Sequence, residues 1–239
     1  MNYKTSHRSV GDSLLKRMQA YSGLSSWAVW SDQVPAHKFT VANRASTVYF
    51  PGASAAALAC LQTGTVFVAM NPGGVLDGKR DLATYHRTNG PFVPWANFHY
   101  PGGKSDYLLA ESVRGTPWRG SYMTDLLPLV TSKSAELHRV LRANPALEAR
   151  WVCEFEEEMA LLSSDPMTLI CFSRPVHQWA TKHLPNNKFH IKYAPHISPA
   201  NGNEHKRCAD MLNIRWVSRE QTYPEILRAI LHNNNCLIC

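Results

Sequence analysis

The stretch TVFVAMNPGG, residues 65–74, joins an apolar run to a glycine-rich turn. Its first six residues are apolar or β-branched, and Asn71-Pro72-Gly73-Gly74 ends the run abruptly. A short run of this kind, closed by turn residues, predicts a strand buried inside a sheet. The function of the turn then depends on what the rest of the chain places opposite the amide side chain of Asn71.

The chain after this strand alternates between strands and helices. Three more buried strands are predicted over 120–129, 167–172 and 188–195. Helices are predicted over 134–143, 145–164, 175–184, 203–212 and 222–232. Such alternation indicates crossover connections, a mainly parallel sheet and helices on both of its faces. We therefore expect an α/β fold with a single domain over 1–239, built on a small, mainly parallel four-stranded sheet flanked by helices.

Three segments stand outside this alternation. Residues 1–60 are expected to form an N-terminal helical part, in which Asp12 caps a helix over 13–21. Residues 74–120 are rich in glycine, proline and aromatic residues, and we expect a long aromatic and basic active-site loop there. Residues 233–239 are expected to form a flexible tail.

The composition is typical of a globular protein without a membrane span. The chain has 239 residues, of which 44% are hydrophobic and 18% are charged. No run approaches the roughly 18 consecutive apolar residues of a membrane-spanning helix. The N-terminus also lacks the apolar core of a signal peptide, so we expect a cytoplasmic monomer that does not bind membranes.

The charge is basic and unevenly distributed. The formal net charge is +7, and residues 1–120 carry 12 Lys and Arg against 6 Asp and Glu. A basic surface with few compensating acids suits a polyanionic partner such as nucleic acid. The one C-x-x-C pair among the cysteines, Cys236 and Cys239, is half a zinc site or a loose match to a prenylation box. We expect ordinary reduced cysteines, no metal and no cofactor.

Turn and polar residues lie at the carboxyl ends of all the predicted strands. They are NPGG, TDLLP, SRP and HISP, which begin at residues 71, 124, 173 and 196. In mainly parallel sheets, ligands bind beyond the carboxyl ends of the strands. These turns therefore predict a functional site at one edge of the sheet.

Two of these segments together resemble the uracil-DNA glycosylase superfamily. AMNPGG, 69–74, is similar to its first motif in the form of the mismatch-specific and single-strand-selective branches, and PHISP, 195–199, is similar to its second motif, His-x-Ser-Pro. YMTD, 122–125, stands where the family reads the base, and motif order and spacing match over about residues 60–215. The resemblance implies a monofunctional DNA glycosylase that flips a pyrimidine nucleotide out of DNA, hydrolyses its base–sugar bond and leaves an abasic site.

The resemblance also implies a role for each motif residue. Asn71 would position the attacking water, and His196 would donate to the 2-carbonyl of the leaving base, where negative charge accumulates. Ser198 and the backbone near Pro199 would hold a DNA phosphate. Further contacts with DNA are expected from Asn201, Lys104 and Arg174. Each motif also has a simpler explanation, because Asn-Pro-Gly-Gly makes a good turn anywhere and the chain has 11 histidines.

Two departures from the family pattern narrow the expected substrate. Asp125 replaces the usual asparagine, and an ionised carboxylate accepts from the 4-amino group of cytosine but repels a 4-carbonyl. The alternatives are that Asp125 is protonated, or that it points away and caps another group. Gly73 and Gly74 stand where uracil-specific members place a bulky aromatic residue, which leaves the 5-position of the base open. A hydroxymethylated or glucosylated cytosine fits both departures, and such bases in bacteriophage DNA suggest an antiviral role.

The remaining base contacts are expected from Met70 and from aromatic residues of the long loop. One of three candidates should stack on the flipped base: Tyr85, Phe92 and Phe98. No bulky wedge follows the second motif, since Ala200-Asn201-Gly202 comes next, so either another loop wedges the DNA or the substrate is easily extruded. Two other functions stay open: a repair glycosylase for uracil or damaged pyrimidines, and a non-catalytic nucleic-acid-binding module.

Overall fold

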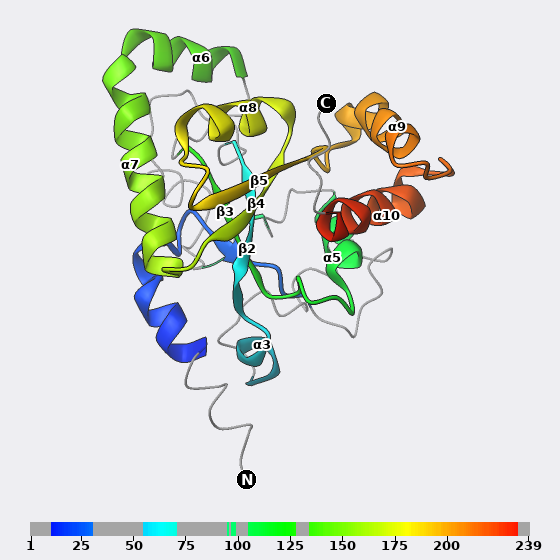
Figure 1. The fold of residues 1–239 in the computed structure, drawn as a ribbon, viewed down its shortest axis with the longest axis horizontal. Coiled ribbons are helices and arrows are strands. Elements are labelled where there is room, and N and C mark those ends of the chain that lie inside the picture. The colour runs from blue at the N-terminus through cyan, green and yellow to red at the C-terminus, as the bar shows by residue number, and fades with distance from the viewer. Residues whose placement is uncertain are drawn as a thin grey trace, which may run out of the picture.

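A five-stranded sheet forms the centre of the protein (Figure 1). The computed structural model describes residues 11–30, 55–70, 95, 97–98, 105–127 and 134–233. In the order β1-β3-β2-β4-β5, the strands span Ser26–Trp27 (β1), Ser121–Asp125 (β3), Gln62–Ala69 (β2), Met167–Phe172 (β4) and Phe189–Ala194 (β5). β2 to β5 run parallel and β1 pairs antiparallel with β3, so the α/β class and the mainly parallel sheet are confirmed.

The expected number of four strands is wrong, because the N-terminal part contributes β1. Trp27 of β1 pairs with Tyr122 of β3, and its side chain is fully buried. The two rings meet edge-on, with 4.9 Å between their centroids. The described residues of the segment 1–60 are therefore not all helical. They comprise a helical turn over 11–17, η1 (Gln19–Tyr21), β1 and α3 (Ala55–Ala59). Asp12 lies within the helical residues 11–17 and not ahead of them.

β2 and β3 remain bonded beyond their regular ends. Leu126 donates its backbone N–H to the carbonyl of Ala69 at 2.9 Å, and Leu127 donates to that of Met70 at 3.0 Å. β3 itself ends at Asp125, so it is shorter than the predicted strand over 120–129. The chain after β3 thus holds Met70, the residue that follows β2, in place.

Helices cover both faces of the sheet (Figure 1). One face carries α7 (Pro145–Leu162) and α8 (Arg174–His183), and α6 (Ser134–Ala143) contacts α7. The other face carries α5 (Asp106–Val113), α9 (Gly202–Met211) and α10 (Arg219–His232). The helix α5 corrects the expectation of one long loop over 74–120. α10 begins earlier than predicted, because the side chain of Ser218 accepts from the N–H of Gln221 and caps the helix.

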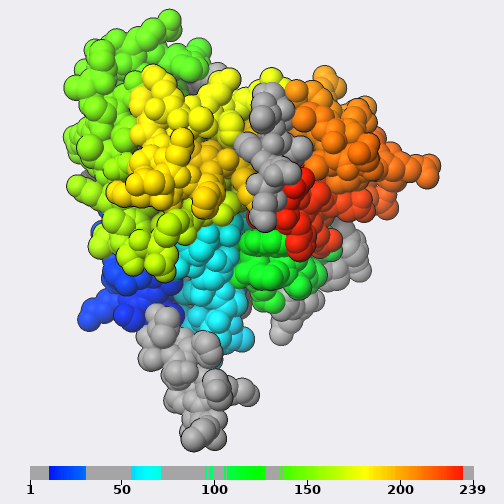
Figure 2. Space-filling model, in the orientation of Figure 1, coloured from blue at the N-terminus to red at the C-terminus, as the bar shows by residue number. Residues whose placement is uncertain are grey.

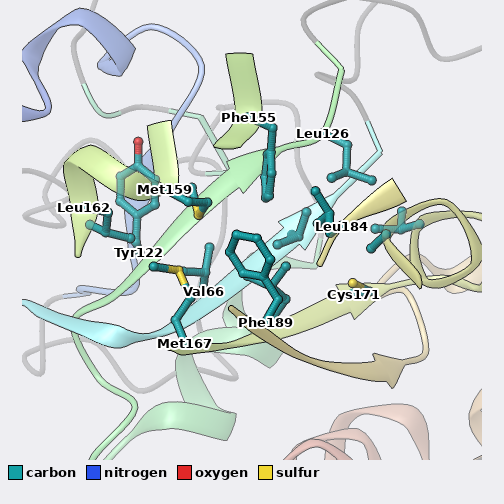
Figure 3. Packing of buried hydrophobic residues seen from close by; sticks show 14 of the residues in the cluster. Val66, Tyr122, Leu126, Phe155, Met159, Leu162, Met167, Cys171, Leu184 and Phe189 are labelled. Atoms are coloured by element: carbon teal, nitrogen blue, oxygen red, sulfur yellow. The ribbon is translucent and has the colours of Figure 1, made fainter. Parts of the chain in front are cut away.

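Each face of the sheet has its own hydrophobic core. Phe155 and Met159 of α7 point toward the strands (Figure 3). The centroid of the Phe155 ring lies 6.4 Å from that of Phe189 on β5. On the other face, Phe67 of β2 stacks on Phe172 of β4, with 5.7 Å between ring centroids. Burying each such side chain contributes roughly 1.5–3 kcal/mol to stability. The polar residues at the ends of β3, β4 and β5 belong to neither core and lie at the edge of the sheet.

Gly120 precedes β3 at a position that only glycine can occupy. Its φ is +82°, and a Cβ there would lie 1.8 Å from the carbonyl oxygen of Cys60. Its N–H donates to the carbonyl of Ala28 at 2.9 Å, and its own carbonyl accepts from the N–H of Gln62 at 3.0 Å. Gly120 therefore ties the start of β3 both to β2 and to the N-terminal segment.

The described part of the chain ends at Asn233. The predicted flexible tail over 233–239 lies, apart from that residue, outside it. Within the described ranges, no helix combines the length and the apolar character that crossing a membrane requires.

Candidate functional site

The carboxyl ends of β2, β3, β4 and β5 lie at one edge of the sheet, because these strands run parallel. Asp125 ends β3, and Met70, Arg174 and His196 follow the ends of β2, β4 and β5. β3 and β5 are three interstrand spacings apart, which is about 14 Å. The fold therefore brings four predicted site residues to one edge, with β2 and β4 between the strands that carry Asp125 and His196.

His196 is held as a neutral imidazole that presents a hydrogen-bond donor. The backbone N–H of Ser198 donates to its Nδ1 at 3.1 Å, so Nδ1 carries a lone pair. Burial, together with the neighbouring His205, lowers the pKa of His196, which favours the neutral ring at neutral pH. The proton of the neutral ring is then on Nε2. An Nε2–H group can donate to an oxygen that gains negative charge during a reaction.

Two residues that the sequence analysis missed hold the backbone around His196. Tyr223 of α10 is fully buried and donates its hydroxyl to the carbonyl of Pro195 at 2.9 Å. The Nε2 of His205 on α9 lies 2.7 Å from the carbonyl oxygen of His196, and His205 is the donor because a carbonyl only accepts. Neither residue carries a local signal, since both read as ordinary helix residues. Together they fix the position of His196 at the end of β5.

Asp125 is a buried carboxyl group held by an amide. Its exposed fraction is 8%, and the Nδ2 of Asn97 donates to its Oδ2 at 2.7 Å. Burial raises the pKa of Asp125 to about 7, although the hydrogen bond from Asn97 acts in the opposite direction. Both the neutral and the ionised forms are therefore populated near neutral pH. Asn97 was not singled out from the sequence, because an asparagine in a loop is common.

Phe98 follows Asn97 and is therefore placed close to Asp125. It is half-buried against the core of α5, α9 and α10, and its φ of 66° is in the left-handed region. Met70 is half-buried against the opposite core, under α7 and α8. Of the three aromatic residues predicted to stack on a base, Phe98 is the one within the described residues.

Ser198, Pro199 and Asn201 form a short turn directly after His196. η4 spans Pro199–Asn201, and the Oγ of Ser198 accepts from the N–H of Ala200 at 3.3 Å. This bond uses a lone pair of the hydroxyl, which keeps its own proton to donate to an anion. Pro199 is exposed, and the segment around α9 that follows projects from one side of the molecule (Figure 2). The turn therefore presents a hydroxyl donor next to an exposed residue.

Arg174 belongs to a cluster around Glu204, in the first turn of α9. The Oε1 of Glu204 lies 3.3 Å from the Nε of Arg174 and 2.7 Å from the Nη2 of Arg207, and it also accepts from the hydroxyl of Tyr193. Burial raises the pKa of Glu204, but the hydrogen bonds from Arg207, Tyr193 and Arg174 outweigh it and hold that pKa below its ordinary value. The Arg174 side chain is 45% exposed, so its guanidinium can still meet an anion.

Glu158 of α7 is a second buried carboxyl group, beside β3. Its Oε1 accepts from the hydroxyls of Tyr122 and Thr124, both at 2.8 Å. Burial raises the pKa of Glu158 to about 7; these two bonds oppose the rise, and the neighbouring Asp125 adds to it. Glu158 thus fixes the residues that lead to Asp125. The sequence does not distinguish it from the other glutamates between 154 and 158.

The other predicted site residues lie outside the described residues. They are Asn71, Gly73, Gly74, Tyr85, Phe92 and Lys104. Their roles stay predictions, although Asn71 directly follows Met70 in the sequence. Within the residues that the structure describes, no group of three or more His, Cys, Asp or Glu could hold a metal ion.

Comparison with known proteins assigns no family to this chain. No family model matches it, and no curated protein sequence matches it. Its function therefore has to be inferred from the motifs and from the geometry at the carboxyl edge of the sheet.

Proposed function

We propose that this protein is a monofunctional DNA glycosylase that removes a 5-substituted cytosine, hydroxymethylated or glucosylated, from DNA. It hydrolyses the base–sugar bond of a flipped nucleotide and leaves an abasic site. The observation that supports this best is the neutral His196, with its Nε2–H donor, on the same sheet edge as the buried carboxyl group of Asp125. The distance of about 14 Å between their strands leaves room for one pyrimidine ring with a hydrogen bond at each end.

The reaction needs a positioned water and a donor for the leaving base. As the bond breaks, the sugar gains positive charge and the base leaves with the electron pair of the bond. The side-chain carbonyl of Asn71 would hold the water next to the sugar carbon. The water supplies its hydroxyl to that carbon, and its second proton ends on the released base.

His196 stabilises the leaving base by donating its Nε2–H to the 2-carbonyl. A donor already in position needs no reorganisation when charge develops, and such a donor contributes about 10²- to 10³-fold to the rate. The bonds from Ser198 to Nδ1 and from His205 to the backbone carbonyl support this orientation.

Asp125 accounts for the choice of a 4-amino base. Its ionised form, present at neutral pH because its pKa is about 7, accepts from an amino group. The aromatic ring of Phe98 is the candidate for stacking on the base. Glycine at 73 and 74, in place of the family's bulky aromatic residue, would leave the 5-position of the base open and admit a substituent. Cytosines of this kind occur in some bacteriophage genomes, so the proposal includes a role in defence against phage.

DNA is the partner that the charge distribution supports. The net charge of +7 favours a polyanion. The hydroxyl of Ser198 and the guanidinium of Arg174 are donors for the phosphates that flank the flipped nucleotide.

Base release from defined oligonucleotides tests the proposal. Each would carry a single 5-hydroxymethylcytosine, glucosylated 5-hydroxymethylcytosine, cytosine, uracil or mismatched thymine, in single and double strands. Abasic sites would be read as breaks after alkali treatment. We expect release of the 5-substituted cytosines and no break without alkali. Release restricted to uracil would indicate a repair glycosylase, and release of no base would leave a nucleic-acid-binding module.

Variants separate catalysis from DNA binding. His196→Ala should lower the rate of base release by about 10²- to 10³-fold, and Asn71→Ala should abolish it, with DNA affinity unchanged in both. The control is His190→Ala, since His190 is exposed and lies near the opposite end of β5. Asp125→Asn should shift preference toward 4-carbonyl bases. An unchanged rate in His196→Ala would contradict the proposal.

A further inference from the structure

Asn97 is an asparagine whose side-chain amide has a single possible orientation. The backbone N–H of Phe98 lies 3.1 Å from Oδ1, and because an N–H only donates, that atom must be the amide oxygen. The Nδ2 group then donates to the backbone carbonyl of Leu24 and to the Oδ2 of Asp125. Both N–H bonds of the amide therefore have a fixed acceptor.

This orientation decides which oxygen of Asp125 can change its state. Oδ2 accepts from Asn97 at 2.7 Å, so a proton on the carboxyl group is carried by Oδ1. When Asp125 is ionised, Oδ1 is an acceptor; when Asp125 is neutral, Oδ1 is a hydroxyl donor. In the described part of the chain, the charged group that interacts electrostatically with Asp125 is Glu158 of α7.

We propose that Asn97 is the positioning residue for base selection: it holds Oδ2 of Asp125, so that Oδ1 is the atom that reads the 4-position of the pyrimidine. This inference rests on the proposed glycosylase function. With Oδ1 as acceptor the site selects a 4-amino base, and with Oδ1 as donor it selects a 4-carbonyl base. The Asn97 hydrogen bond favours the ionised carboxylate and hence the 4-amino base.

The base preference should therefore change with pH, and Asn97 should set the pH of the change. In the wild type, preference for a 4-amino over a 4-carbonyl base should rise as the pH rises through about 7, where Asp125 ionises. Without the Asn97 donor, Asp125 loses a bond to its charged form and its pKa rises. The midpoint of the preference should then move up by about one pH unit, and the preference at pH 7.5 should fall roughly tenfold.

The test uses two substrates that differ only at the 4-position. Oligonucleotides with a single 5-hydroxymethylcytosine or 5-hydroxymethyluracil would be compared in single-turnover reactions from pH 5.5 to 9, for the full-length wild type and Asn97→Ala. Asn97→Asp is the second variant, because it keeps the acceptor for Phe98 but removes the Nδ2 donor to Asp125 and Leu24. Its added carboxyl group repels the ionised Asp125, so it should raise the midpoint at least as far as Asn97→Ala does. The control is Gln19→Ala, which removes a side-chain amide that does not contact Asp125. The Nε2 of Gln19 donates to the hydroxyl of Ser22 at 3.4 Å.

The outcomes separate this inference from the function on which it rests. A midpoint that moves up in both Asn97 variants, and stays in the control, supports the role of Asn97. The wild type could release bases while both folded variants keep its midpoint and its ratio of rates. Asn97 would then only hold its loop against the sheet, and the inference would be wrong. If Asn97→Ala does not fold, Asn97→Asp decides in the same way. Release of neither base by the wild type would refute the proposed removal of 5-substituted cytosines, and this inference with it.

Discussion

Replacing Glu158 by glutamine should make the stability of the protein less dependent on pH. Folded Glu158 has a pKa of about 7, raised by burial from its ordinary value of 4.5. Between these two values the folded protein keeps a proton that the unfolded chain has released. The free energy of unfolding therefore falls as the pH rises from 4.5 to 7, and the loss stays constant above that range. Glutamine has no such proton, so Glu158→Gln avoids this loss.

The size of the effect follows from the two pKa values. Each pKa unit corresponds to about 1.4 kcal/mol, so the full loss is about 3 kcal/mol, of which about 2.5 kcal/mol falls between pH 5 and pH 8. Asp125 acts in the same direction and is present in both proteins. Glutamine also removes the repulsion between Glu158 and Asp125, which lowers the loss further and does not change the sign of the difference. The glutamine oxygen can still accept from Tyr122 and Thr124, as Glu158 does.

Urea unfolding at several pH values measures this difference. Relative to the wild type, Glu158→Gln should gain about 2.5 kcal/mol in the free energy of unfolding between pH 5 and pH 8. The matched control is Glu157→Gln, an exposed position on the same helix, which should show no such gain. If the two curves for Glu158→Gln and wild type stay parallel within about 0.5 kcal/mol, Glu158 does not carry a raised pKa and the reasoning from burial fails.

Two further substitutions test the backbone around the carboxyl edge of the sheet. Ser173→Gly should raise the free energy of unfolding by about 1 kcal/mol, because Ser173 has a φ of 100° and a ψ of 155°, a region that suits glycine; a lower melting temperature would contradict this. Tyr223→Phe should cost about 1–3 kcal/mol, since it leaves the buried carbonyl of Pro195 without its hydroxyl donor. It should also slow base release by moving His196, and wild-type stability and rate together would refute that role.

Local sequence patterns were sufficient for the main strands and helices. β4 occupies the predicted residues 167–172, since a short β-branched apolar run closed by turn residues is a signal that neighbouring residues carry. The strand β1 has two residues, too few to form such an apolar run. Its pairing depends on the burial of Trp27 against Tyr122. The helix α5 was missed because its surroundings are rich in glycine and proline.

The candidate site also has features that the sequence predicts and features that only the folded structure sets. The sequence by itself determined that Asp125 and His196 lie near the carboxyl ends of predicted strands. Parallel pairing then placed them at one edge of the sheet. Only the tertiary structure decided their chemical states. Asn97 is 28 residues from Asp125 along the chain, and the hydroxyl of Tyr223 reaches a carbonyl 28 residues away. Protonation and orientation depend on burial and on partners within about 3 Å, and those distances exist only once the chain has folded.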